Sequence, residues 1–234
     1  MARVQPAVEV ASGMNTIAQS SLDLQPIDWL GLHTTCLHED YETEMRALAA
    51  LVRSVNARTM VEFGCRDGRT AQVLLHNVPT LQHYVGIDVP YSYQSPLPFQ
   101  HDWQVPEPGS LARDNPKFEL IIRDRGTLDL TTNDLPAADV VFIDGDHSGP
   151  IVLQDSLLAR SVVRGNGLII WHDYKDDSLI EVLETVDGLI QWGWAVDHVE
   201  GTWLAICRAS SLSLSRECGD LETASTLVHS SGQL

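Results

Sequence analysis

Basic residues are scarce in this sequence. Its 234 residues include 15 Lys and Arg against 32 Asp and Glu, which gives a formal net charge of −17 and an isoelectric point near 4.7. A surface of this charge repels polyanions, so DNA, RNA and anionic membranes are poor partners. The charge balance therefore argues against a nucleic-acid substrate and directs the search towards small molecules.

Paired cysteines and long apolar runs are also missing. The four cysteines lie far apart and form no CxxC pair, which indicates a reducing compartment. No stretch approaches the roughly 20 apolar residues that a membrane-spanning helix needs, and the first 21 residues lack the apolar core of a secretory signal. We therefore expect a soluble, cytoplasmic protein, with 44% hydrophobic residues available for a core.

The length fits one ordinary domain with an arm and a tail. Residues 1–21 are small and polar, and residues 210–234 are rich in Ser and Thr. We predict a flexible arm over 1–21, a folded domain over 22–209 and a mobile tail over 210–234.

Within the predicted domain, short apolar strands alternate with helical segments. This alternation is typical of βαβ units and predicts an α/β fold, in which helices cover both faces of a mostly parallel sheet. Two late apolar segments, 194–199 and 203–209, are expected to pair as a closing antiparallel hairpin. The other strands are expected at 59–64, 82–88, 117–124, 138–144 and 167–173, and the helices at 38–55, 67–77, 153–164 and 176–186.

One segment breaks this alternation. Residues 89–116 are rich in proline and aromatic residues where a helix would otherwise stand, and proline disfavours a helix interior. The segment is expected to be irregular and to lie near the carboxyl edge of the sheet. It is either a lid over a ligand or a connector whose aromatic side chains pack on the sheet.

A glycine turn follows the first of these strands. Glu62 leads into Gly64 and Gly68, and glycines at such a position allow a sharp turn and a close approach of backbone to ligand. Asp88 ends the next strand, about 20 residues beyond the turn, where an acid can accept hydrogen bonds from ribose hydroxyls. This arrangement predicts an adenosine-containing ligand.

The residues of the turn discriminate among such ligands. A nicotinamide-binding turn would read GxGxxG, whereas the middle glycine is absent here, and the GxxxxGK[ST] phosphate loop is absent altogether. The acid Glu62 would repel a pyrophosphate but suits the ammonium and sulfonium groups of S-adenosylmethionine. On these residues the sequence resembles the class I S-adenosylmethionine-dependent methyltransferases. The resemblance implies a Rossmann-like fold with a mostly parallel seven-stranded sheet.

Two further strands end in acidic clusters. The segment FIDGDHS closes one at Asp144, and WHDY closes the next at His172 and Asp173. Neighbouring parallel strands lie about 5 Å apart, so these three side chains can share a divalent ion, with the carboxylates favouring Mg²⁺ or Mn²⁺. Alternatively, Asp144 contacts only the cofactor, and the other two residues form a helix cap and a loop hydrogen bond.

These two segments make the resemblance more specific. They are similar to the small-molecule O-methyltransferases, the group that includes catechol, antibiotic-sugar and cephalosporin-pathway enzymes, over residues 38–209. The resemblance implies cofactor contacts from the acid entering the turn, the glycines, the hydroxyl residue after them, the ribose acid and the acid of the fourth strand. In this sequence those positions are Glu62, Gly64, Gly68, Thr70, Asp88 and Asp144.

The same resemblance implies a divalent cation held by Asp144, His172 and Asp173. Two positions depart from the pattern. Arg66 replaces the middle glycine of the turn, and His172 stands where Asp or Glu is expected, which affects the identity of the metal. The acceptor of the methyl group cannot be carried over.

The predicted reaction is methyl transfer from a sulfonium to a hydroxyl oxygen of a small molecule such as a sugar, a phenol or a natural product. A base must take the hydroxyl proton, and Asp146 and His147, just past the metal acid, are both candidates. The rival predictions are a metal-independent enzyme with His147 as base, a nicotinamide oxidoreductase, and a non-catalytic binding module. The sequence leaves the oligomeric state open.

Overall fold

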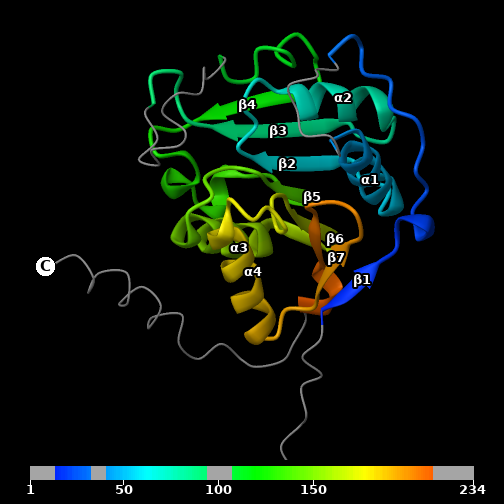
Figure 1. The fold of residues 1–234 in the computed structure, drawn as a ribbon. Helices are drawn as coiled ribbons and strands as arrows, with labels where there is room; N and C mark the ends of the chain where they lie inside the picture. Colours follow the sequence, from blue (N-terminus) through cyan, green and yellow to red (C-terminus); the bar gives the residue numbers. More distant parts are fainter. Residues whose placement is uncertain (1–13, 33–40, 94–106, 213–234) are drawn as a thin grey trace, which may run out of the picture.

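The computed structural model describes residues 14–32, 41–93 and 107–212. In these ranges a single mixed sheet of eight strands has the order β1-β7-β8-β6-β5-β2-β3-β4 (Figure 1). The strands are Asn15–Ile17 (β1), Thr59–Phe63 (β2), His83–Asp88 (β3), Phe118–Ile122 (β4), Ala138–Ile143 (β5), Val163–Trp171 (β6), Val196–Val199 (β7) and Ala205–Arg208 (β8).

The sheet is parallel except at β8, which pairs antiparallel with both β6 and β7. The predicted mostly parallel sheet with an antiparallel closing hairpin is therefore confirmed. The helices are Tyr41–Ser54 (α1), Arg69–Asn77 (α2), Gly149–Val162 (α3) and Ile180–Gln191 (α4), and short 3-10 turns connect several elements.

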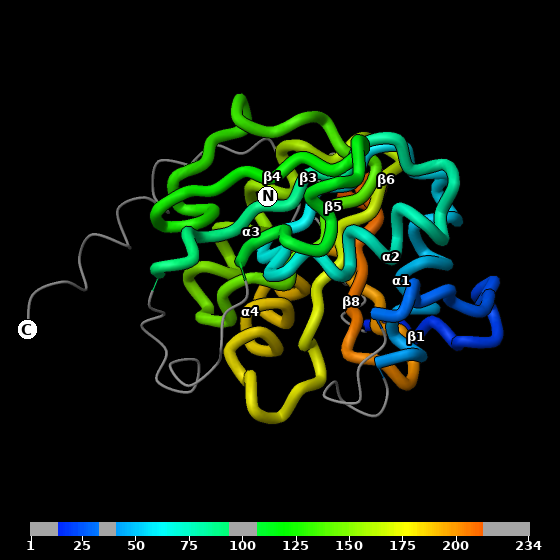
Figure 2. Tube along the Cα trace, turned by 90° about the horizontal axis from the view of Figure 1, so that it is seen from above, coloured from blue at the N-terminus to red at the C-terminus, as the bar shows by residue number. Residues whose placement is uncertain are grey.

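Helices cover both faces of the sheet because the strand residues alternate between two apolar layers. Met60 of β2 packs with α1 and α2 in one core cluster. The next residue, Val61, packs with α3 and α4 in the other. Seen from above, the two helix pairs lie on opposite sides of the strands (Figure 2). This period of two is what burial of a parallel strand on both faces requires.

The first strand corrects two expectations. Asn15–Ile17 of the predicted flexible arm forms the edge strand β1, parallel to β7, so the sheet has eight strands and not seven. Ile17 packs against the core, and Gln19 donates a side-chain hydrogen bond to the carbonyl of Glu200 at 2.8 Å. These contacts fix residues whose composition alone resembles a free terminus. Residues 1–13 of the arm and 213–234 of the tail lie outside the described residues.

The irregular segment is described only at its two ends. Residues 89–93 and 107–116 form turns and no helix, as the prolines predict, while 94–106 lie outside the described residues, and the lid prediction with them. No helix in the described ranges is both long and apolar enough to cross a membrane.

Candidate active site

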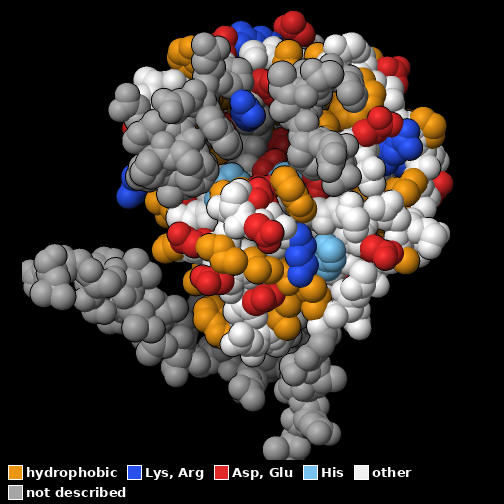
Figure 3. Space-filling view, in the orientation of Figure 1, with side chains coloured by type: hydrophobic (Ala, Val, Ile, Leu, Met, Phe, Trp, Pro, Cys, Tyr) orange, Lys and Arg blue, Asp and Glu red, His pale blue; other side chains and the backbone are white. Residues whose placement is uncertain are grey.

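Strands β2, β3, β5 and β6 end at one edge of the sheet, and their following residues bring the predicted site together. On the face of the molecule shown in Figure 3, acidic and histidine side chains gather in a hollow. Ligands of open parallel sheets bind at this carboxyl edge, so the topology alone places the predicted cofactor residues and metal ligands next to each other.

The glycine turn packs directly on the end of β5. Gly64 has a φ of +85°, and a Cβ built on it would lie 2.3 Å from the carbonyl oxygen of Asp144. Gly68, with a φ of +79°, is the N-cap of α2, and half-buried Thr70 follows in the first helical turn. Only a residue without a side chain fits at Gly64, so the turn and Asp144 are held in close contact.

Asp88 supports the same turn from β3. One oxygen of its carboxylate accepts a hydrogen bond from the backbone N–H of Arg66 at 2.5 Å, and the other accepts from Val89 at 2.7 Å. Burial raises the pKa of Asp88, and the two backbone hydrogen bonds oppose that rise. The acid that the sequence assigns to ribose binding thus also fixes the turn.

Glu62 lies beneath the turn and is buried. Its carboxylate accepts a hydrogen bond from the hydroxyl of Tyr84 at 2.9 Å. Burial raises the pKa of Glu62 well above its ordinary value, and the nearby charge of Asp144 raises it further. Burial and the charge of Asp144 likewise raise the pKa of Tyr41, at the start of α1, to about 12.

The acids and histidines after β5 and β6 form one connected cluster. His172 Nδ1 lies 2.8 Å from Oδ1 of Asp173 and 3.3 Å from Oδ1 of Asp144. The second oxygen of Asp173 lies 2.8 Å from Nε2 of His147. Asp173 therefore bridges two histidines, and Asp144 joins them from the neighbouring strand.

The charges of these carboxylates change the protonation of the histidines. Burial alone would lower the pKa of each, but Asp144 and Asp173 hold the pKa of His172 well above its ordinary value. The hydrogen bond and charge of Asp173 also raise the pKa of His147 above its ordinary value. In return, and despite burial, His172 and His147 hold the pKa of Asp173 well below its usual range.

Asp146 is occupied at the start of α3. Its Oδ1 accepts hydrogen bonds from both the backbone N–H and the hydroxyl of Ser148, the N-cap of α3, the former at 2.8 Å. Asp146 thus forms a turn that leads into the helix and engages its N-cap residue. Of the two candidate bases, His147 is the one whose contacts point into the acidic cluster.

Comparisons with known proteins identify the kind of domain that carries this site. Residues 61–174, just under half of the chain, match a family model described as a methyltransferase domain. The matched residues run from β2 to just beyond β6 and include the glycine turn and both acidic strand ends. Residues 61–174 of the chain therefore form a methyltransferase domain. No curated protein sequence matches it.

Solved structures share the fold of this methyltransferase. The SAH-bound Podospora anserina methyltransferase PaMTH1 is 12% identical with a TM-score of 0.53, covering 71% of this chain and 78% of its own. CalS11, a TDP-rhamnose 3'-O-methyltransferase of calicheamicin biosynthesis, is 13% identical with a TM-score of 0.52 over 74% and 81%. Cofactor-bound Rv0187 from MTB is 17% identical with a TM-score of 0.51 over 82% and 86%. At these identities the likeness shows the fold.

The cluster in this methyltransferase has the dimensions of a cation site. Ligand atoms of Asp144, His147 and Asp173 all lie within 4.8 Å of one another, so His147 joins the two acids in this group where the sequence predicts His172. His172 Nδ1 nevertheless lies close to one oxygen of each acid. Octahedral ions bind oxygen at about 2.1 Å, which sets adjacent ligands about 3 Å apart, close to the 2.8 to 3.3 Å separations here. The cluster lines a cavity of about 10 Å³, the room that one small ion or water needs.

Two residues of the methyltransferase site were missed by the sequence reasoning. Glu44 of α1 is buried, and its Oε2 lies 3.1 Å from Nε2 of His172; Tyr41 lies three positions earlier. A signal for Glu44 exists, since an acid at 44 shares the helix face of Leu48 and Leu51, where an apolar residue is expected. Tyr41 carries no such signal.

Proposed function

We propose that this methyltransferase transfers the methyl group of S-adenosylmethionine to a hydroxyl oxygen of a small molecule with the help of a divalent cation. The observation that carries the proposal is the convergence of Asp144, His147, His172 and Asp173 directly against the glycine turn. Carboxylates and imidazoles this close together are the donor set of a Mg²⁺- or Mn²⁺-type site.

The turn and the strand ends supply the cofactor site of the proposal. Gly64 and Gly68, both with positive φ, form the turn that leads into α2, and Thr70 lies in the first turn of that helix. Asp88 offers its remaining lone pairs to ribose hydroxyls. Glu62 and Asp144 place negative charge near the ammonium and sulfonium groups of the cofactor, whose positive charge offsets the repulsion between these acids.

Asp144, His172 and Asp173 would hold the cation, and His147 reaches the same position. A bound divalent ion supplies a Lewis acid that lowers the pKa of a hydroxyl near it. The protein residues orient the acceptor towards the methyl group, since in-line displacement demands alignment. His147 then receives the hydroxyl proton, because Asp146 is engaged with Ser148.

A second candidate is metal-independent methyl transfer with His147 as base. The 2.8 Å contact between His147 and Asp173 favours it, since a carboxylate that orients an imidazole is a common base arrangement. The net charge of −17 supports a small acceptor over a nucleic acid in both candidates.

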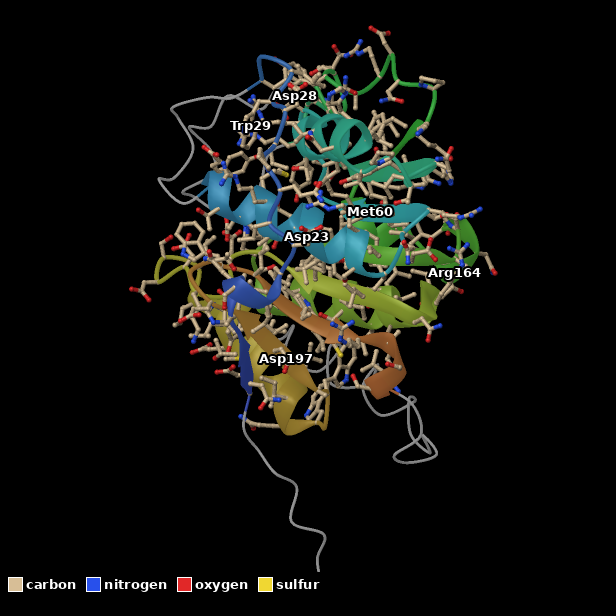
Figure 4. The ribbon with its side chains drawn as sticks, turned by 90° about the vertical axis from the view of Figure 1, so that its right-hand side faces the viewer. Asp23, Asp28, Trp29, Met60, Arg164 and Asp197 are labelled. Atoms are coloured by element: carbon tan, nitrogen blue, oxygen red, sulfur yellow. The ribbon has the colours of Figure 1, made fainter. Side chains whose placement is uncertain are left out.

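Calorimetric titration of S-adenosylmethionine tests the proposal, first in EDTA and then with Mn²⁺ or Mg²⁺. We expect micromolar cofactor binding and a separate, saturable heat for the metal. Asp173→Asn should lose the metal heat. The control Asp197→Asn removes an acid from β7 (Figure 4), where Asp197 accepts a hydrogen bond from Asn15 of β1 and is not part of the cluster, and should keep the metal heat.

The outcomes separate the candidates. Cofactor binding without a metal heat would overturn cation assistance and leave the His147 mechanism. No cofactor binding under any condition would overturn the enzyme and favour a binding module. Transfer of radiolabelled methyl to a panel of sugars and phenols then identifies the acceptor class.

A further inference from the structure

Glu44 is a buried acid that the proposed function does not use. It lies in the first turn of α1, and its side chain is 4% exposed. An acid is rarely buried without partners. Each carboxylate oxygen of Glu44 has a hydrogen-bond partner. Oε2 contacts Nε2 of His172 at 3.1 Å, and Oε1 accepts the backbone N–H of Trp203, in the loop between β7 and β8.

The hydrogen bond from Trp203 fixes which oxygen of Glu44 faces His172. A backbone N–H can only donate, and the Trp203 backbone is also held through its carbonyl, which accepts a hydrogen bond from the N–H of Tyr174 at 2.9 Å. An ionised carboxylate can only accept. The oxygen of Glu44 that faces His172 therefore requires a proton on Nε2, which leaves the lone pair of a neutral His172 on Nδ1.

Nδ1 is the nitrogen that faces the acidic cluster, 3.3 Å from Asp144 and 2.8 Å from Asp173. The rings of Phe142 and Trp203 contact the imidazole edge-on, with centroids 6.1 and 6.2 Å away, and hold it in this orientation. We propose that Glu44 is a positioning residue that fixes the tautomer of His172 and thereby makes Nδ1 a metal ligand. This inference rests on the cation of the proposed function.

The substitution Glu44→Gln tests the inference with little change in shape. The Trp203 N–H would keep its hydrogen bond by donating to the amide oxygen of the glutamine, so the amide NH₂ would face His172. Nε2 would then have to accept, which moves the proton of the neutral ring to Nδ1, in the metal position. Loss of such an outer carboxylate partner weakens metal binding about 10- to 100-fold.

The experiment is Mn²⁺ titration followed by electron paramagnetic resonance, on the full chain without cofactor or acceptor. We expect Glu44→Gln to weaken Mn²⁺ binding at least tenfold. The matched control Glu42→Gln removes an acid from the same turn of α1, where Glu42 is 46% exposed and pairs with Arg46, and should change the affinity less than twofold. Thermal unfolding shows whether each variant folds.

Equal Mn²⁺ affinity in wild type and Glu44→Gln would overturn the inference. No Mn²⁺ binding by wild type would instead overturn the cation itself, so the two failures are distinct. If Glu44→Gln does not fold, the tautomer of His172 in the wild-type protein tests the inference instead. Two-bond ¹⁵N–¹H spectra of the Zn²⁺-loaded protein should show the His172 proton on Nε2, and a proton on Nδ1 would overturn the inference.

Discussion

Asp173 has a left-handed backbone conformation, with a φ of +58°, immediately after β6. Such a conformation costs a residue other than glycine about 1 kcal/mol or more, although aspartate tolerates it better than most. At this position each oxygen of the carboxylate contacts a different histidine, His172 and His147. Asp173 thus serves the proposed cation site, whereas Asp88 serves the proposed cofactor site.

Asp88→Asn and Asp173→Asn should accordingly separate cofactor binding from metal binding. We expect Asp88→Asn to weaken S-adenosylmethionine binding about 10- to 100-fold, the effect of losing a charged hydrogen-bond acceptor, and to leave Mn²⁺ binding unchanged. Asp173→Asn should weaken Mn²⁺ binding by at least as much and change cofactor binding less than threefold. Calorimetry measures both, and loss of both ligands in both variants would contradict separate sites.

Asp146 and His147, adjacent in sequence, should differ in the kind of effect they have. Asp146→Ala removes the acceptor at the start of α3, so we expect a loss of about 1 kcal/mol of stability, or 2 to 4 °C in melting temperature. Its methyl transfer should persist. His147→Ala should lower transfer by 10²-fold or more, the usual effect of removing a general base. The reverse pattern would identify Asp146 as the base.

How far the sequence predicts the site depends on where each residue stands. Asp144, His172 and Asp173 end apolar strands, and parallel topology brings such ends together whatever lies between them. Glu44 reaches the cluster from a helix more than 100 residues away in sequence. Its contact depends on the packing of α1 over β6, which no local pattern encodes.

At the scale of elements, patterns with a strong period are the ones the sequence predicts well. Strands β2, β3 and β5 match their expected ranges closely because they are continuous apolar runs. The last helix begins at Ile180 and not at 176, because Asp176 accepts hydrogen bonds from Ser178 and closes a turn ahead of it. Strand β1 has three residues, too few to show any alternation, and only its pairing with β7 reveals it.

Helix α3 contains a buried acid that predicts a pH dependence. Asp155 is 1% exposed, and its Oδ1 has no hydrogen-bond partner among the residues that the structure describes. Burial raises the pKa of Asp155 to about 7, although a hydrogen bond from Thr127 opposes the rise. The folded protein therefore holds this proton between about pH 4 and 7 when the unfolded chain has lost it.

It follows that stability falls as the pH rises through this window, because the native state binds more protons than the unfolded state. Asp155→Asn removes the titration. We expect the variant to gain stability relative to wild type from pH 5 to pH 8, by on the order of 2 to 4 kcal/mol. Urea unfolding across that range measures the difference, and a difference that does not change with pH would contradict a raised pKa.

At the scale of the whole molecule, the net charge of −17 acts on every cation in solution. Repulsion among the 32 acidic residues destabilises the compact state, and salt screens it. Any cation therefore stabilises this protein to some degree, and a thermal shift in Mn²⁺ alone does not identify a site. What distinguishes a site is a shift that survives at constant ionic strength and that depends on one carboxylate.

We therefore expect NaCl to raise the melting temperature of wild type and Asp173→Asn by the same amount. At matched ionic strength, Mn²⁺ at about 100 times its dissociation constant should add about 2.7 kcal/mol to wild type only, or roughly 5 to 10 °C. Asp197→Asn carries the same charge change outside the cluster and should behave as wild type. An equal Mn²⁺ shift in all three proteins would mean that the ion acts on the acidic surface as a whole. The cluster of Asp144, His147, His172 and Asp173 would then act only as the base that takes the proton of the acceptor hydroxyl.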